Sequence, residues 1–330
     1  IPSRPVMAQT TPCSMECSGN DIWPELQDAV VGGDCSYILL TNGVAGPCWV
    51  SATVKILNRE GLRIEGEGAT TTEIQWQGGD NIPMFSLQNS SGVAIAHLEI
   101  ATAPHPTSGQ TLVSAIDVYN ACVDGLITVN GVEHDHCLGH DFADGPGSHG
   151  NSFENLRIRQ GNKDNWLFNG IRILLHPDFE PGSPGDCSTD EWADCGNGGH
   201  TFDNVHVQNV HHSAFVIEGK ASVGNTFWET HCTAIFSGST LGDDGNLDPN
   251  CCGDSCVRSG REGVPDSAGS FSWYGGLAGG VADAIFVVHS DPDTIHVSGL
   301  YCERSHRLLR TADPLPSIDQ DDMVVVTSDP

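Results

Sequence analysis

A short motif recurs three times in the middle of the chain and restricts the folds that the chain can adopt. In one-letter code it reads G-[NH]-[ST]-F-x-[NE]-x-[RH], where x is any residue. The copies lie at residues 150–158, 199–207 and 224–232. The last two copies are 25 residues apart, and the 49 residues between the first two include a Cys-rich insertion. Repeats of this length with turns and no helix are typical of solenoids, whose coils bury their apolar faces by stacking.

Short apolar segments bounded by Gly, Asn and Thr continue this pattern on both sides of the motif. Because many turn residues separate them, we expect strands at 37–40, 52–57, 62–65, 73–76, 85–88, 93–100, 115–119, 126–129, 285–289, 294–297 and 300–310. Only 22–31 has a helical pattern, with Asp21 as its N-cap. Stacking also predicts two columns, a core column of Phe153, Phe202 and Phe227 and a turn column of Asn155 and Asn204.

Three segments resemble the coils of right-handed parallel β-helix proteins of the pectate-lyase-like superfamily. They are V-K-I-L-N-R-E-G-L-R-I-E-G-E-G at 54–68, N-S-F-E-N-L-R-I at 151–158 and H-T-F-D-N-V-H-V at 200–207. The resemblance implies an all-β, single-domain parallel β-helix over residues 45–310, with disulfide-stapled long loops near 177–199 and 237–280. Residues 1–44 would then form an N-terminal tail and capping segment, and 311–330 a C-terminal tail. Lyases, hydrolases, epimerases and non-catalytic proteins share this fold, so the fold alone does not define the activity.

Composition limits the partners and the compartment. A formal charge of −29, from 43 acidic and 14 basic residues, would repel nucleic acid, and there is no membrane-spanning apolar run. Thirteen Cys, several in Cys-rich loops without zinc-site spacing, predict disulfides in an oxidising compartment. We therefore expect a secreted monomer, and the first residue Ile1, rather than Met, suits a removed signal peptide. Cys137 and Cys232, on predicted strands, are candidates for buried free thiols.

Parallel stacking places equivalent outward side chains about 4.8 Å apart. When Val132, Leu156, Val205, Thr230 and Leu300 are aligned, the next position forms a column of Glu133, Arg157, His206, His231 and Tyr301. Two residues further lies a column of Asp135, Arg159, Gln208, Thr233 and Glu303. We expect the catalytic residues to be Glu133, Asp135, Arg157, Arg159, His206 and His231. The substrate-binding residues would be Trp228, Tyr301 and Gln208, with Trp228 stacking on a sugar ring.

Acid, guanidinium and imidazole groups in adjacent rows suit a polysaccharide substrate. β-Elimination of a uronic acid needs a cation for the carboxylate, such as Arg157 or Arg159, and a base for the C5 proton, such as His206 or His231. Hydrolysis needs two carboxylates flanking the bond, for which Glu133, Asp135, Asp141 and Asp144 are available. We favour a lyase over a hydrolase. The alternatives are a solvated ladder of paired ions, or a non-catalytic β-helix that binds a glycan or a surface partner.

A register shifted by one residue would place different side chains outside the coil. His134 and His136 would then point outward with His140 nearby, which suits a transition metal and makes a metal-dependent enzyme a further alternative function. Partly buried, hydrogen-bonded histidines are the structural alternative. The loop at 243–248 offers oxygen ligands for Ca²⁺ without the EF-hand register, and an ordinary acidic turn is the alternative. The sequence implies no definite cofactor beyond these two candidate ions.

Overall fold

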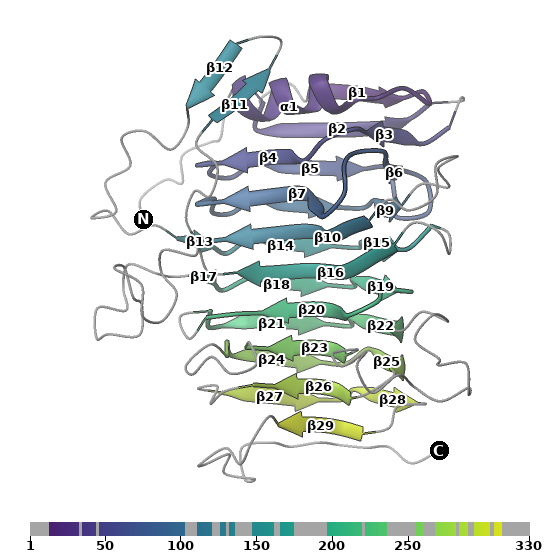
Figure 1. The fold of residues 1–330 in the computed structure, drawn as a ribbon, viewed down its shortest axis with the longest axis vertical. Coiled ribbons are helices and arrows are strands. Elements are labelled where there is room, and N and C mark those ends of the chain that lie inside the picture. The colour runs from purple at the N-terminus through teal and green to yellow at the C-terminus, as the bar shows by residue number, and fades with distance from the viewer. Residues whose placement is uncertain are drawn as a thin grey trace, which may run out of the picture.

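The computed structural model describes most of the chain, including the repeat region. The described residues are 13–32, 35–43, 46–102, 111–120, 126–129, 132–135, 147–161, 166–174, 197–219, 222–235, 255–260, 268–281, 284–289, 294–303 and 307–311. Within these ranges the chain is β-structure apart from one helix, α1 (Trp23–Gly32). Strands follow one another from sheet to sheet, so the chain winds into an elongated right-handed parallel β-helix (Figure 1).

Each complete coil contributes one strand to each of three parallel sheets. The first sheet contains β1 (Cys13–Cys17), β2 (Tyr37–Asn42), β5 (Arg63–Gly66), β8 (Ala94–Ala96), β14 (Ser152–Glu154), β18 (Thr201–Asp203), β21 (Asn225–Trp228), β24 (Phe271–Tyr274) and β27 (Ile295–Ser298). The second contains β3 (Cys48–Val50), β6 (Glu73–Trp76), β9 (Glu99–Thr102), β15 (Arg157–Arg159), β19 (His206–Gln208), β22 (His231–Ile235), β25 (Leu277–Val281) and β28 (Tyr301–Glu303). The third contains β4 (Val54–Leu57), β7 (Ile82–Gln88), β10 (Thr111–Tyr119), β16 (Trp166–Leu174), β20 (Ser213–Ile217), β23 (Ser255–Ser259), β26 (Ala284–Val288) and β29 (Arg307–Thr311).

Two small sheets lie outside the three main ones. β11 (Leu126–Val129) and β12 (Val132–Asp135) form an antiparallel hairpin, and β13 (Ser148–His149) pairs in parallel with β17 (Asn197–Gly198). The chain leaves the third sheet after β10, forms the hairpin beside α1 at the N-terminal end of the stack, and returns through β13 (Figure 1). The β11–β12 hairpin therefore belongs to an insertion between two stacked coils.

The predicted aromatic column is confirmed inside the helix. The rings of Phe153 and Phe202 stack with centroids 5.2 Å apart, and those of Phe202 and Phe227 with centroids 4.4 Å apart. Trp273 continues the stack at 4.7 Å from Phe227, and all four side chains are buried. Parallel stacking in register brings these rings together, and offset or stacked aromatic pairs add to the stability of the core beyond the area they bury.

The predicted Asn column is confirmed at the corner between the first and second sheets. Asn155 and Asn204 have positive φ angles of 49° and 51°, and Asn204 Nδ2 donates to Asn155 Oδ1 over 2.7 Å. Asn tolerates this left-handed conformation better than most residues. His97 takes the same conformation, with a φ of 55°, and separates β8 from β9. The segment 93–100, predicted as one strand, is therefore two strands on two sheets.

The second position of the motif forms a buried ladder of hydrogen bonds between coils. Val93 N donates to Asn151 Oδ1 over 2.9 Å, and Asn151 N donates to His200 Nδ1 over 3.2 Å. His200 N in turn donates to Asn225 Oδ1 over 3.3 Å, and His200 Nε2 lies 2.9 Å from Asn197 Oδ1. Because Nδ1 accepts, Nε2 carries the proton. Burial lowers the pKa of His200 to about 3, so the imidazole is neutral. The motif therefore requires Asn or His at this position because each supplies a neutral acceptor.

The N-terminal end of the stack is covered by α1 and held by disulfides. Asp21 Oδ1 accepts a hydrogen bond from Trp23 N over 3.0 Å, which confirms that Asp21 caps this helix. The buried Gln27 bonds both backbone polar groups of Lys55, at 2.7 and 2.9 Å. Two disulfides, Cys13–Cys35 and Cys17–Cys48, tie this end together.

Two further expectations, on a cysteine and on a loop, are wrong within the described ranges. Cys232 is not a free thiol but is bonded to Cys256, because both point into the core from successive strands of one coil. The segment 237–280 is not one long loop, since β23, β24 and the first residues of β25 lie inside it. Cys302 is the free cysteine among the described residues, and Cys137 lies outside them. Within the same ranges no helix has the length and apolarity of a membrane span.

Candidate functional site

The outer face of the second sheet carries a row of charged and imidazole side chains. The strand register pairs Glu73 with Glu99 and Glu99 with Arg157. It then pairs Arg157 with His206 and His206 with His231. Arg159 lies two residues beyond Arg157 on the same strand. We call these residues the second-sheet ladder: Glu73, Glu99, Arg157, Arg159, His206 and His231. The column of Arg157, His206 and His231 that the sequence repeat predicts is therefore the order in which these residues pair in the structure.

The N-terminal half of the ladder is a network of ion pairs around Glu99. The Glu99 side chain is only 6% exposed, and it accepts from Arg159 Nε over 2.5 Å and lies 3.4 Å from Arg157 Nη1. Arg159 also lies 3.6 Å from Glu73. Arg157 makes the longer contact to Glu99 and is 41% exposed, so its guanidinium is the cation of this network that is most accessible to an anionic ligand.

The C-terminal half of the ladder is a pair of imidazoles. The rings of His206 and His231 have centroids 4.1 Å apart. Burial, the neighbouring His231 and the cation of Arg157 lower the pKa of His206. Burial lowers the pKa of His231, and the carboxylate of Glu229 opposes this shift. Both rings are therefore neutral at neutral pH and have a nitrogen that can accept a proton.

Glu133 and Asp135 do not precede Arg157 in the ladder, contrary to the sequence alignment. Both lie on β12, whose one partner among the described strands is β11 in the antiparallel hairpin. The coil that stacks before Arg157 is β8–β9–β10, and its carboxylate is Glu99. The 24-residue spacing from Val132 to Leu156 is thus coincidental.

A sequence signal for Glu99 was present and was missed. Gly92 and Leu98 stand six residues apart, as do Gly150 and Leu156 in the first copy of the motif. This match identifies the preceding coil, even though Ile95 stands at the Phe position of the motif and His97 at the Asn position.

The predicted substrate-binding residues lie in three different places. Gln208 is directly beside Arg159 in the register. Tyr301 lies at the C-terminal end of the same row, but Leu277 separates it from His231. Trp228 is on the first sheet, across the corner at Glu229. Only Gln208 is therefore a direct neighbour of the charged part of the ladder.

The metal hypothesis stays a prediction. His134 lies on β12, while His136 and His140 are outside the described residues, as are Asp141, Asp144 and the acidic loop at 243–248. In the part of the chain that is described, no group of three His, Cys, Asp or Glu residues is arranged to hold a metal ion.

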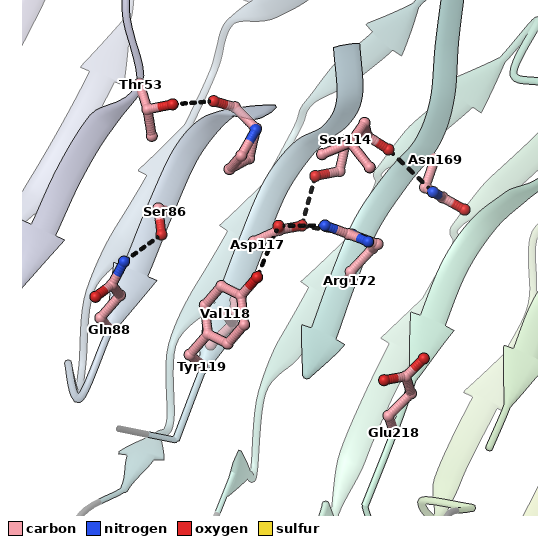
Figure 2. A network of polar contacts seen from close by, with 12 residues as sticks. Thr53, Ser86, Gln88, Ser114, Asp117, Val118, Tyr119, Asn169, Arg172 and Glu218 are labelled. Carbon is pink, nitrogen blue, oxygen red and sulfur yellow. Dashed lines mark hydrogen bonds and ion pairs between the residues drawn. The ribbon is translucent and has the colours of Figure 1, made fainter. Parts of the chain in front are cut away.

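A second polar network, on the third sheet, was not predicted (Figure 2). Asp117 is fully buried and accepts two hydrogen bonds from Arg172, from Nε over 2.8 Å and from Nη2 over 2.5 Å. Ser114 Oγ donates to the same carboxylate over 2.5 Å, and Tyr119 Oη lies 3.4 Å from it. Burial and the charge of Asp117 raise the pKa of the Tyr119 hydroxyl. Further along the sheet, Glu218 pairs with Arg258.

This network is arranged for stability rather than for turnover. The carboxylate of Asp117 is enclosed and bonded on both oxygens, so it has no exposed acceptor for a substrate. A second carboxylate–arginine pair lies two coils further on, where Arg258, the register partner of Val216, reaches Glu218 at 3.2 Å. The alternation of apolar and charged residues in Ile116–Asp117–Val118 and Ile171–Arg172–Ile173 is the signal that would have located the first pair.

Comparisons with known proteins find likeness only at low sequence identity. No protein-family model and no curated protein matches the chain. A glycoside hydrolase family 87 α-1,3-glucanase catalytic domain in complex with nigerose has 10% identity and a TM-score of 0.47 over 92% of this chain and 47% of its own. An endo-xylogalacturonan hydrolase from Aspergillus tubingensis has 11% identity and a TM-score of 0.47 over 94% of this chain and 79% of its own. An alginate lyase from Paenibacillus sp. str. FPU-7 has 13% identity and a TM-score of 0.41 over 91% and 98%.

These values limit what the comparisons show. The chain spans about half the length of the glucanase domain. The similarity concerns the path of the chain, and no substrate or catalytic residue transfers at such identities. The order of the strands in three parallel sheets makes this chain a right-handed parallel β-helix, as the resemblance of its repeats implies.

Proposed function

We propose that the protein cleaves an acidic polysaccharide by β-elimination on the second-sheet ladder. The observation that carries this proposal is the position of the exposed cation of Arg157 directly beside the neutral imidazole pair. β-Elimination needs these two groups side by side, because the carboxylate that activates the C5 proton of a uronate must be neutralised while a base removes that proton.

Each residue then has a defined role. The guanidinium of Arg157 binds the uronate carboxylate and stabilises the negative charge that develops on it. His206, next to Arg157 in the register, takes the C5 proton. The electron pair forms the C4–C5 double bond, the C4–O bond breaks, and the imidazolium returns its proton to the leaving oxygen. His231, stacked on His206, is the alternative base.

The carboxylates of the ladder favour elimination over hydrolysis. Hydrolysis requires two carboxyl groups that are free to act on either side of the bond. Glu73 and Glu99 are both paired with Arg159, and Glu99 is mostly buried. They serve better to hold the two arginines in place than to act as an acid and a base.

The proposal includes an extracellular location. Three disulfides occur among the described residues, and such bonds persist in oxidising compartments. A secreted enzyme also meets polymeric substrates that do not enter cells.

The test is an activity assay with a panel of acidic polysaccharides, including polygalacturonate and alginate. Ultraviolet absorbance of the unsaturated uronate reports elimination. We expect Arg157→Ala and His206→Ala to abolish this signal without changing the unfolding transition, because both side chains are at the surface. Arg63→Ala is the matched control: Arg63 is a surface arginine on the first sheet that pairs with Glu65 and Glu154, and its loss should leave activity unchanged.

Other results would overturn parts of the proposal. Full activity in both ladder variants would show that the second-sheet ladder is not the site. New reducing ends without unsaturated product would show hydrolysis. A protein that binds these polymers but forms no product would be a glycan-binding β-helix.

A further inference from the structure

The outer face of the first sheet carries an exposed aromatic stack that the proposed chemistry does not use. Trp228 and Tyr274 are partners in the strand register, and their rings stack with centroids 4.3 Å apart. His296 on the next strand packs against Tyr274 at 5.3 Å. Trp228 is nevertheless 46% exposed. The indole is therefore part of a row of adjacent rings on the surface rather than an isolated exposed side chain, and such aromatic patches are typical of ligand-binding surfaces.

One face of the Trp228 indole is open, because the neighbouring side chain on that side is short. Tyr274 covers the face on its C-terminal side. On the other side the register partner is Asp203, which is exposed and has a side chain much shorter than an indole. The outer part of the indole therefore extends past Asp203. Among the described residues no aromatic ring packs on this second face, so a flat ring of another molecule can lie there.

The negative charge of Asp203 beside the open face of the indole indicates which kind of ligand ring can bind there. The carboxylate of Asp203 makes no hydrogen bond or ion pair with any described side chain. The next acidic residue along the row, Glu154, is already paired with Arg63 at 3.2 Å. The carboxylate of Asp203 can accept hydrogen bonds from hydroxyl groups and repels another carboxylate. The indole of Trp228 next to this carboxylate therefore suits a pyranose ring that carries hydroxyl groups and no charge.

We propose that Trp228 and Asp203 form a binding site for a neutral sugar ring of a polysaccharide. The ring stacks on the free face of the indole, and its hydroxyl groups donate to Asp203. This site carries a negative charge and suits an uncharged sugar, whereas Arg157 of the second-sheet ladder carries a positive charge and suits a uronate.

This site is independent of the proposed lyase activity. Glu229 has a φ of 42° and turns the chain between β21 and β22, so Trp228 and His231 stand on different faces of the helix. A sugar ring on the free face of the indole lies over Asp203 on the first sheet, whereas the imidazoles belong to the second sheet. The site therefore anchors the protein to neutral glycan whether or not the ladder is catalytic.

Affinity electrophoresis tests the site with defined polymers. The native protein is run in gels that contain dextran, xyloglucan, galactomannan or a soluble β-glucan, and in a gel with polygalacturonate. We expect at least one neutral polymer to retard the wild-type protein. Trp228→Ala should weaken that binding by about tenfold, which corresponds to the loss of one stacking contact. Asp203→Ala should weaken it less.

Controls separate this site from the ladder and from misfolding. His231→Ala should bind the neutral polymer as the wild-type protein does. Trp228→Ala should still unfold in one cooperative transition, with a small loss of stability from the missing stack on Tyr274. The proposal is overturned if no neutral polymer retards the wild-type protein, or if Trp228→Ala is retarded equally. Loss of retardation in His231→Ala but not in Trp228→Ala would also overturn it.

Discussion

The buried imidazole of His200 predicts a specific dependence of stability on pH. The ring accepts a hydrogen bond from Asn151 N and is closed off from solvent. Burial lowers its pKa from the ordinary value of 6.5 to about 3. Between these two values the unfolded chain binds a proton that the folded protein does not. The contribution of His200 to stability is therefore complete above pH 6.5 and is lost as the pH falls from 6.5 towards 3.

The size of the effect follows from these two values. Between pH 7.5 and pH 5 the linkage relation gives a loss of about 2 kcal/mol in the free energy of unfolding from this one residue. Over the whole interval the loss is about 5 kcal/mol, which is comparable to the total stability of many domains. At pH 5 the effect remains small enough for the protein to stay folded during the measurement.

His200→Asn isolates this effect because Asn stands at the same motif position in the neighbouring coils, at 151 and 225. An Asn here supplies the acceptor for Asn151 N and does not titrate. Urea unfolding of both proteins, followed by Trp fluorescence with the disulfides intact, gives the free energy of unfolding at each pH. From pH 7.5 to 5 the wild-type protein should lose about 2 kcal/mol more than the variant. Parallel pH profiles would show that His200 titrates normally and would refute the reasoning.

The remaining predictions concern the third sheet, the core disulfide and the proposed base. Arg172→Met leaves the buried carboxylate of Asp117 without its partner and should cost about 3–5 kcal/mol in urea unfolding; the addition of Asp117→Asn should recover part of the loss, and no recovery would contradict the pairing. Replacing Cys232 and Cys256 together by Ala should lower the free energy of unfolding by about 3 kcal/mol, because the bond closes a loop over a sequence separation of 24. If His206 is the base, its lowered pKa means that kcat/KM should be constant above pH 7 and fall at a pH below the ordinary 6.5; a decline that begins above pH 7 would exclude this assignment.

The two arginine networks show why sequence patterns identify ladders but not their roles. Arg157 and Arg172 both stand between apolar residues on a strand, and each meets a carboxylate from the preceding coil. Arg157 is 41% exposed and lies beside two neutral imidazoles. Arg172 instead pairs with Asp117, whose side chain is fully buried. Local sequence is nearly the same in the two cases. The difference arises from what surrounds each strand, and for that reason we propose chemistry at one network and a structural role for the other.

The repeat alone determined the fold class, the stacked Phe and Asn columns, and the alignment of Arg157 with His206 and His231. Each of these depends on neighbouring coils of similar sequence, in which the strand period places equivalent side chains above one another. The tertiary structure decided which coil precedes Arg157, because the insertion after β10 interrupts the period and stacking selects Glu99 instead of Glu133. It also joined Cys232 to Cys256, since inward positions on successive strands meet only when the coil closes. A period in the sequence specifies register between adjacent coils, whereas contacts across an insertion or between sheets depend on how the buried faces pack.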